Sequence, residues 1–396
     1  MTETRIPLSR PDLSGAEVEE VLGVLRSPFL SMGPKVVEFE QHFAAFLGVQ
    51  HAVAVANGTC GLHLALRAVG VGPGTEVLTT PFTFVATANA ILVAGGRPVF
   101  IDVEAQTLNV TPDGVAAVIA RDYVPREDGL VHRVTGTRLA AIMPVATFGH
   151  PVEMDGLRAV ARAVGLPIVH DTCESFGSLF RSTEKGAWIS EAQLADAAVY
   201  AFYPNKQITT GEGGMVVTAD AAIAERCRME RNQGRRPGSD WLDHEGLGFN
   251  YRMDELSAAL GVAQLRRVEE LLARRARVAQ WYDEALAPLP EVERPRAAPW
   301  AQVAWFVYVI RLRRGITRDA VIAHLAAGGI AAKPYFPPVH LMPHLRALGY
   351  REGDFPVAED VAGRTIALPF FNALTHDQVM DVASTLREAI YANVEA

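Results

Sequence analysis

The residue best suited to covalent chemistry is a lysine, Lys206, in a glycine-rich loop between two predicted strands. The loop spans residues 202–214 and reads FYPNKQITTGEGG. In a tight, apolar loop an amine loses its proton more easily than on the surface, and a neutral amine is what attack on an aldehyde requires. The same string also fits a solvated lysine beside a glycine-rich turn, so the loop alone leaves both interpretations open.

A carboxylate at the end of a predicted buried strand is the second candidate. Asp171 follows Ile168-Val169-His170, and an α/β sheet presents its functional groups at the carboxyl edge of its strands. The pyridine nitrogen of pyridoxal phosphate (PLP) needs such an anion, because the protonated ring is the electron sink. A turn-capping role is the alternative, since aspartates at strand ends often cap the next turn.

Two further segments suit a phosphate and a flat ring. Residues 57–61 (NGTCG) form a strand-to-helix turn, whose free N–H groups and helix dipole can hold a phosphate dianion. Ordinary helix capping explains the same residues. Residues 79–84 (TTPFTF) end another strand with aromatic side chains, and Phe84 could lie flat on a cofactor ring. A core position is the alternative for this phenylalanine.

These segments must be positioned by strands and helices. From about residue 13 to 250, short apolar runs alternate with amphipathic segments, which indicates a sheet covered on both faces. A helix is predicted at residues 62–69, and strands at 52–56, 76–80, 98–102, 139–144, 167–171, 197–202 and 215–218. The predicted fold class is therefore α/β, with a large domain built on a mostly parallel seven-stranded sheet.

The pattern changes in the last third of the chain. Residues 253–286 form one long helical pattern that could connect the large domain to the C-terminal residues. A strand is predicted at 305–312, and helices at 318–327, 357–365 and 375–392, the last capped by Thr375. We therefore expect two domains. Residues 1–252 form an N-terminal arm and the large domain, and residues 253–396 form a smaller C-terminal α+β domain.

Composition excludes several classes of protein. The chain has 396 residues, 49% of them hydrophobic, which suffices for one large core and a smaller one. The net charge of -8, with no basic cluster denser than residues 226–236, argues against nucleic-acid binding. No stretch approaches the roughly 18 apolar residues of a membrane span, so we expect a cytoplasmic protein without membrane contact. Cys60, Cys173 and Cys227 show no metal-site or disulfide spacing, so no metal is expected.

Taken in order, these strings resemble the DegT/DnrJ/EryC1/StrS family of fold-type-I PLP-dependent transferases, typified by nucleotide-sugar aminotransferases. The resemblance extends over nearly the whole chain. The segments that carry it are residues 29–34 (FLSMGP), 57–59 (NGT), 81–87 (PFTFVAT), 170–174 (HDTCE), 202–214, 248–253 (GFNYRM), 335–341 (YFPPVHL) and 353–358 (GDFPVA).

The resemblance implies a role for each matching residue around the cofactor. Lys206 corresponds to the lysine that holds PLP as a Schiff base, and Asp171 to the partner of the pyridine nitrogen. Phe84 corresponds to the ring that stacks on one face of PLP, and Cys173 to the small residue under the other face. Glu174 stands where the family has a polar side chain near the phenolic oxygen.

The resemblance also implies how the phosphate is held. The backbone of Gly58, Thr59 and Cys60 corresponds to the phosphate cup, and Asn250 is supplied by the neighbouring subunit, which implies a homodimer with shared active sites. Family members often carry a serine five residues before the lysine, where this chain has Ala201. Losing one neutral hydrogen bond should cost about 1 kcal/mol, so we expect PLP to bind less tightly.

The reaction implied by the resemblance is a two-stage transamination. An amino donor, expected to be glutamate, gives its amino group to the cofactor, which passes it to a keto group of a nucleotide-linked deoxysugar. Lys206 is anchor and general acid/base in turn. Candidate walls of the substrate site are Gly33, Arg235, Arg236, Arg252, Tyr335 and His340.

Three alternatives stay open at this point. The acceptor could be a keto-cyclitol, or the cofactor could serve elimination or dehydration, although the dehydratase branch of the family replaces the equivalent of Lys206 with histidine. From another class, the chain could be a regulatory or binding protein that keeps the fold, against which the intact pair of Lys206 and Asp171 argues. No role is predicted for His170, which stands where an acidic residue is common.

Overall fold

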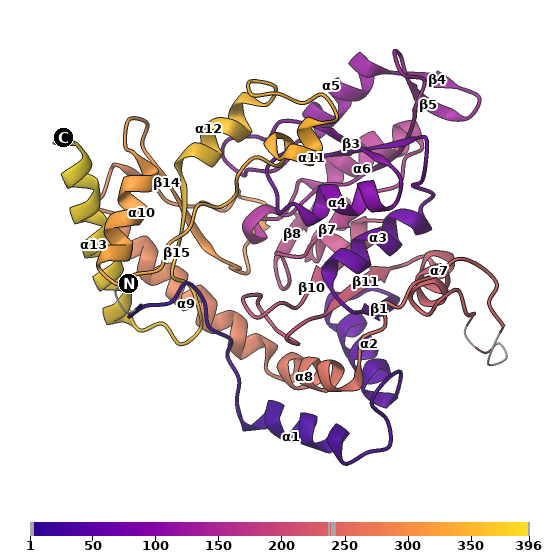
Figure 1. The fold of residues 1–396 in the computed structure, drawn as a ribbon, viewed down its shortest axis with the longest axis horizontal. Coiled ribbons are helices and arrows are strands. Elements are labelled where there is room, and N and C mark those ends of the chain that lie inside the picture. The colour runs from indigo at the N-terminus through magenta and orange to yellow at the C-terminus, as the bar shows by residue number, and fades with distance from the viewer. Residues whose placement is uncertain (1–3, 237, 239–242, 395–396) are drawn as a thin grey trace.

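The computed structural model describes residues 4–236, 238 and 243–394 (Figure 1). Two mixed sheets form the centre of its N-terminal part. The first has the order β1-β11-β10-β7 and the second β3-β2-β6-β5-β4, and isolated parallel bridges between Ile142 and Ile168 and between Val145 and Asp171 connect them. The strands are β1 (His51–Val55), β2 (Thr75–Thr79), β3 (Arg97–Phe100), β4 (Tyr123–Arg126), β5 (Gly129–His132), β6 (Arg138–Ile142), β7 (Val169–Asp171), β10 (Ala197–Ala201) and β11 (Gly214–Thr218).

The α/β class is confirmed, but a single, mostly parallel sheet of seven strands is not. Each of the seven predicted segments contains a strand. However, β11 runs antiparallel to both β1 and β10, and the β4–β5 hairpin adds two antiparallel strands beside β6. The reason for the orientation of β11 is its connection. The loop after β10 contains no helical crossover, and neighbouring strands joined directly pair antiparallel.

Helices cover both faces of these strands. On β10, Ala198 and Tyr200 belong to one apolar cluster with α2, α5 and α6, whereas Ala197 and Val199 belong to another with α3, α4 and α7. Because successive side chains of a strand point to opposite faces of the sheet, β10 contributes side chains to two separate apolar cores. The helices of this part are α1 (Gly15–Leu25), α2 (Pro34–Leu47), α3 (Gly58–Ala68), α4 (Ala86–Val93), α5 (Pro112–Asp122), α6 (Met154–Val164) and α7 (Ala221–Arg231).

The long helix predicted over residues 253–286 is in fact two helices, α8 (Glu255–Arg266) and α9 (Val268–Leu286). The break is at Arg267, whose φ of -107° and ψ of 8° are not helical. Its guanidinium binds Glu17 Oε1 at 2.8 Å and Asp12 Oδ1 at 3.1 Å. No proline or glycine marks this break in the sequence. Ion pairs to residues far away in the chain accompany it instead, so the break has no local sequence signal.

The C-terminal part has a sheet of its own, in the order β12-β14-β15, with β12 (Val292–Glu293), β14 (Tyr308–Leu312) and β15 (Thr365–Leu368). Its main helices are α10 (Arg318–Ala327), α12 (Pro356–Arg364) and α13 (His376–Val394), which confirm the three predicted helices to within two residues. Thr375 caps the last helix, since its Oγ1 accepts from the Gln378 amide at 3.2 Å. Short elements complete the chain: β8 (Leu179–Ser182), β9 (Ala187–Ile189), β13 (Ala301–Gln302), α11 (Pro343–Arg346), and the 3-10 turns η1 (Thr147–Gly149), η2 (Glu191–Leu194) and η3 (Val339–Leu341).

The strand predicted from residue 305 begins only at Tyr308. The carbonyl oxygens of Trp305 and Phe306 accept hydrogen bonds from the buried guanidinium of Arg275 instead of a strand partner, at 2.7 and 2.9 Å.

At the other end of the chain, Ile6 belongs to the C-terminal core. The division between residues 252 and 253 therefore stays a prediction. Among the described helices, none combines the length and the apolar character that crossing a membrane would take.

Candidate active site

A cavity of about 420 Å³ opens at the carboxyl ends of β7 and β10. It brings together segments that are far apart in the sequence: the start of α3, the segment before α4, the end of β7 and the loop after β10. Among its walls are these predicted residues: Gly58, Thr59, Phe84, Asp171, Cys173, Glu174, Lys206 and Tyr335. The structure thus gathers most of the predicted cofactor residues around one space.

Lys206 extends into this cavity from a well-anchored loop. The loop is tied to Phe202, whose carbonyl oxygen accepts from the Thr209 hydroxyl and from the Thr210 amide, both at 3.0 Å. Lys206 Nζ lies 3.9 Å from the centroid of the Phe306 ring. The side chain of Lys206 is only 13% exposed, so the lysine is an enclosed one rather than a solvated loop residue.

Glu174 is the carboxylate that faces the lysine. Its Oε1 lies 3.6 Å from Lys206 Nζ, and its Oε2 accepts from the Phe148 amide at 2.9 Å. Burial raises the pKa of Glu174 even though the positive charge of Lys206 opposes the shift. A carboxyl group so placed can take up and release a proton next to the lysine amine.

Asp171 is buried and held by a fixed donor on each oxygen. The Thr87 hydroxyl donates to Oδ2 at 2.7 Å, and the Cys173 amide donates to Oδ1 at 3.1 Å. Thr83 supports Thr87 through a 2.8 Å contact between their hydroxyls. Asp171 therefore caps the following turn and lines the cavity as well. A carboxylate has about four acceptor positions, so these two bonds leave capacity for a donor inside the cavity.

The first turn of α3 forms another wall. Asn57 is its N-cap and accepts from the Cys60 amide at 2.9 Å, so this amide is already engaged. Gly58 and Thr59 are the residues of the turn that line the cavity. A Cβ at Gly58 would lie 2.7 Å from the Cβ of Ala201, which explains why the position is glycine.

Some of the predicted binding residues lie outside the cavity lining that the described residues form. Asn250 is exposed and bridges to Asn232 through the backbone. Gly33 is the N-cap residue of α2, and its amide donates to Glu255 Oε1 at 2.9 Å. A Cβ at Gly33 would lie 2.7 Å from Glu255 Oε2, so close packing accounts for this glycine.

The charged residues predicted for the substrate are also away from the described lining. Arg236 forms an ion pair with Glu245 at 2.8 Å, and Arg252 donates to Asn232 Oδ1 at 2.9 Å. The amide of Arg235 donates to the carbonyl of the same asparagine at 3.1 Å. His340 is fully buried, with Nε2 3.0 Å from Glu359 Oε1. Of the predicted substrate residues, Tyr335 is the one that this cavity includes.

Comparison with known proteins identifies the family of the chain. Residues 11–387 match the DegT/DnrJ/EryC1/StrS aminotransferase family. The chain is 37% identical over 391 residues to a GDP-perosamine synthase of Caulobacter vibrioides, with 98% of each chain covered. It is also 37% identical over 366 residues to the erythromycin biosynthesis sensory transduction protein EryC1 of Saccharopolyspora erythraea, with 92% of each covered.

The chain belongs to the DegT/DnrJ/EryC1/StrS aminotransferase family. Solved structures show the same fold over nearly the whole chain. The structure of S. venezuelae DesV in complex with a ketimine intermediate has a TM-score of 0.85 and 34% identity, covering 97% of this chain and 98% of that one. The aminotransferase TlmJ of Streptoalloteichus hindustanus has a TM-score of 0.86 and 30% identity, covering 99% and 100%. The protein is thus a PLP-dependent aminotransferase of a family that includes sugar aminotransferases.

Several residues of this aminotransferase site were missed from the sequence. Thr83 and Thr87 lie within residues 81–87, quoted for the family resemblance, and their spacing of four residues could have indicated two neighbouring hydroxyls. Phe306 comes from the C-terminal part, with no local signal that connects it to Lys206. Phe336 lies in the segment 335–341 that carries the family resemblance, but it was not singled out.

His170, to which no role was assigned, lies on the other side of β7 from Asp171, because successive strand residues alternate. It is fully buried, with Nε2 2.9 Å from Glu191 Oε1 and Nδ1 3.1 Å from the Pro144 carbonyl. Burial opposes the charged form, but the Glu191 carboxylate outweighs it and raises the pKa of His170. The residue forms a structural ion pair behind the site.

Proposed function

We propose that this protein moves an amino group from an amino acid, expected to be glutamate, to a keto group of a nucleotide-linked deoxysugar, with PLP held on Lys206. The observation that carries the proposal is the enclosed pair of Lys206 and Glu174, which shares one cavity with the carboxylate of Asp171. The family and the name of the GDP-perosamine synthase relative support a sugar acceptor.

The residues of the cavity fit PLP. The unused acceptor capacity of Asp171 suits a protonated pyridine nitrogen, and the start of α3 suits a phosphate. Phe84 lines the cavity with 59% of its surface exposed, so its ring is available to a flat cofactor. Asn205 also lines the cavity, and its buried Oδ1 has no hydrogen-bond partner in the described chain, so this side chain keeps an acceptor for a ligand.

When bound, PLP supplies the carbonyl group that receives the amine and the ring that stabilises the carbanion. The chain supplies the proton transfers. Lys206 Nζ anchors the cofactor and, once free, is the base placed to take a proton from the Cα of the donor. Glu174, with its raised pKa, can keep a proton close to that amine. The Phe306 ring beside the amine keeps water from it.

Tyr203, Asn205 and Tyr335, which also line the cavity, offer hydroxyl and amide groups to the acceptor. We further propose that the protein is a homodimer and that Asn250 reaches the phosphate in the other copy of the chain. The exposed position of Asn250, away from the cavity of its own chain, supports this placement.

The test is a two-stage assay with purified holoenzyme. In the first stage, glutamate should yield one equivalent of 2-oxoglutarate per active site. In the second, after glutamate is removed, the protein is mixed with a panel of nucleotide-linked 4-keto and 3-keto deoxysugars and with keto-cyclitols. Amination of a nucleotide-linked sugar supports the proposal. Amination of cyclitols alone, or of neither class, would contradict the proposed acceptor.

A further inference from the structure

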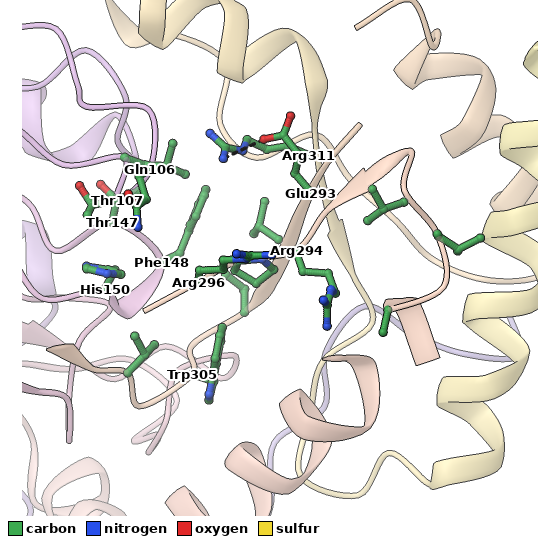
Figure 2. A pocket seen from close by; sticks show the side chains of 18 of the residues that line it. Gln106, Thr107, Thr147, Phe148, His150, Glu293, Arg294, Arg296, Trp305 and Arg311 are labelled. Carbon is green, nitrogen blue, oxygen red and sulfur yellow. Dashed lines mark ion pairs between the residues drawn. The ribbon is translucent and has the colours of Figure 1, made fainter. Parts of the chain in front are cut away.

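A second cavity, of about 450 Å³, lies between the N-terminal and C-terminal parts (Figure 2). One wall comes from residues 106–108, 147, 148 and 150, and the other from residues 287–296 and 303–311. Its size falls within the roughly 300–1,000 Å³ of small-molecule sites. It includes Pro295 and Arg296, to which the amino-transfer reaction gives no role.

The charge of this second cavity is positive. It is lined by Arg294, Arg296, Arg311 and one carboxylate, Glu293, all labelled in Figure 2. Arg311 Nη2 pairs with Glu293 Oε2 at 2.9 Å, so these charges compensate. Arg294 donates to a backbone carbonyl oxygen, that of Asp283, at 2.6 Å. Within the described chain, neither Arg294 nor Arg296 has a carboxylate partner, which leaves two guanidinium groups for an anion.

The other residues that line the second cavity suit an aromatic ligand that carries hydrogen-bonding groups on the edge of its ring. Thr147 is 1% exposed, and its buried Oγ1 has no hydrogen-bond partner in the described chain. A buried hydroxyl without a partner is costly, so a ligand that bonds to it gains affinity. Trp305 and Phe148 provide aromatic surface in the same cavity. His150 lines the cavity, but both of its ring nitrogens are already engaged. Its Nδ1 lies 2.7 Å from the Pro151 carbonyl oxygen, and its Nε2 accepts from the Ala298 amide.

The two cavities share a wall. Phe148 lines the second cavity, and its amide donates to Glu174, the carboxylate that faces Lys206. The ring of Phe148 also lies 5.2 Å from the ring of Phe336, which lines the active site. Phe148 has a φ of 56°, a left-handed conformation that is costly for a phenylalanine and is held only by its surroundings.

A second connection runs through neighbouring residues of one segment. Trp305 lines the second cavity, and Phe306 lines the active site 3.9 Å from Lys206 Nζ. Arg275 holds the carbonyl oxygens of both residues and that of Asn205, next to the lysine. A shift of either shared wall therefore changes the surroundings of the reactive amine.

We propose that the second cavity binds a nucleoside phosphate. The base lies against Trp305 and Phe148, with a hydrogen bond to Thr147, and the phosphate lies on Arg294 and Arg296. Binding changes the rate of amino transfer by displacing the Phe148 amide from its position on Glu174. The effect on amino transfer rests on the proposed function, whereas the binding of the nucleotide to the second cavity does not.

Binding is tested by calorimetric titration of the holoenzyme with adenosine, guanosine and uridine monophosphates and with inorganic phosphate. At least one nucleotide should bind more tightly than phosphate, and Arg296→Ala should weaken its binding about tenfold, as loss of a charged hydrogen bond implies. Arg313→Ala is the matched control, because Arg313 is exposed and outside the cavity lining. Equal affinity in wild type and Arg296→Ala, or equal affinity for nucleotide and phosphate, would overturn the proposal.

Communication is tested in the glutamate half-reaction, without any sugar acceptor. A saturating nucleotide should change the rate of 2-oxoglutarate formation at least twofold in wild type and in Arg313→Ala, and the nucleotide concentration that gives half of this change should be about tenfold higher in Arg296→Ala. An unchanged rate in wild type overturns the communication. Absence of 2-oxoglutarate under all conditions counts against the proposed function instead, since the titration measures binding without turnover.

Discussion

At the scale of single residues, the hydroxyl of Thr87 positions the carboxylate of Asp171. It donates to Oδ2 at 2.7 Å in a buried site, where loss of a donor costs about 1–3 kcal/mol. We expect Thr87→Val to slow the glutamate half-reaction about tenfold, whereas Thr87→Ser should stay close to wild type. Stopped-flow measurement of the cofactor absorbance gives the rates. A wild-type rate in Thr87→Val would show that the cysteine amide alone holds Asp171.

Position 201 tests the proposed phosphate site, because a serine in place of Ala201 would supply one further hydrogen bond to the phosphate of PLP. Its side chain lines the active-site cavity beside Gly58, where relatives often have a serine. Ala201→Ser adds one neutral hydrogen bond of about 1 kcal/mol, so PLP should bind about fivefold more tightly. Equilibrium dialysis of the apoenzyme measures the dissociation constant, with Thr59→Val as the comparison that should weaken binding. Equal or weaker binding in Ala201→Ser would contradict the proposed phosphate position.

His170 predicts a pH dependence of stability. Its pKa is raised above the ordinary 6.5 in the folded state, because attraction by Glu191 outweighs burial. The stabilisation is therefore complete below about pH 6.5 and is lost as the pH rises through the raised pKa. The difference in free energy of unfolding between wild type and His170→Gln should shrink from pH 6 to pH 9. A difference that is constant with pH in urea unfolding would contradict the charged pair.

At the scale of elements, the sequence predicted most helices and strands, but not the direction in which β11 runs or the point at which the long helical segment breaks. Apolar periodicity identifies α10 and the seven strand segments, since that signal is local. The break at Arg267 depends on ion pairs with Asp12 and Glu17, about 250 residues earlier in the chain. Such a break has no local signature. The orientation of β11 was predictable in principle, because the glycine-rich loop that precedes it has no helical pattern.

The carboxylate of Glu255 joins two helices. It accepts from the amides of Gly33, Lys35 and Val36 at 2.8–2.9 Å, and so caps α2 from the first turn of α8. Three backbone donors, of which the Val36 amide is fully buried, would lose their acceptor in Glu255→Ala, which should lower the free energy of unfolding by about 2–3 kcal/mol. Guanidinium unfolding measures the change, and Glu269→Ala, an exposed glutamate of α9, should change it by less than about 0.5 kcal/mol. Equal effects would contradict the capping role.

At the scale of the whole molecule, the site could be predicted where its residues lie within short motifs. Lys206 and Asp171 were identified because each lies at or after the end of a strand, and the ends of neighbouring strands meet in space. Glu174 was identified only through the resemblance of residues 170–174 to the family. Phe306 and Arg275 could not be identified, because they reach the lysine loop from elements about 70 to 100 residues away. The second cavity between the two parts has no sequence signature for the same reason.

The central claim is that Lys206 carries the amino-transfer chemistry, and one measurement tests it directly. Holoenzyme is mixed with ¹⁵N-labelled glutamate, and 2-oxoglutarate and enzyme-bound ¹⁵N are quantified in a single turnover. Wild type and the exposed-lysine control Lys185→Ala should each give one equivalent of both products per active site, and Lys206→Ala should give neither. Equal yields from Lys206→Ala and wild type would contradict the account.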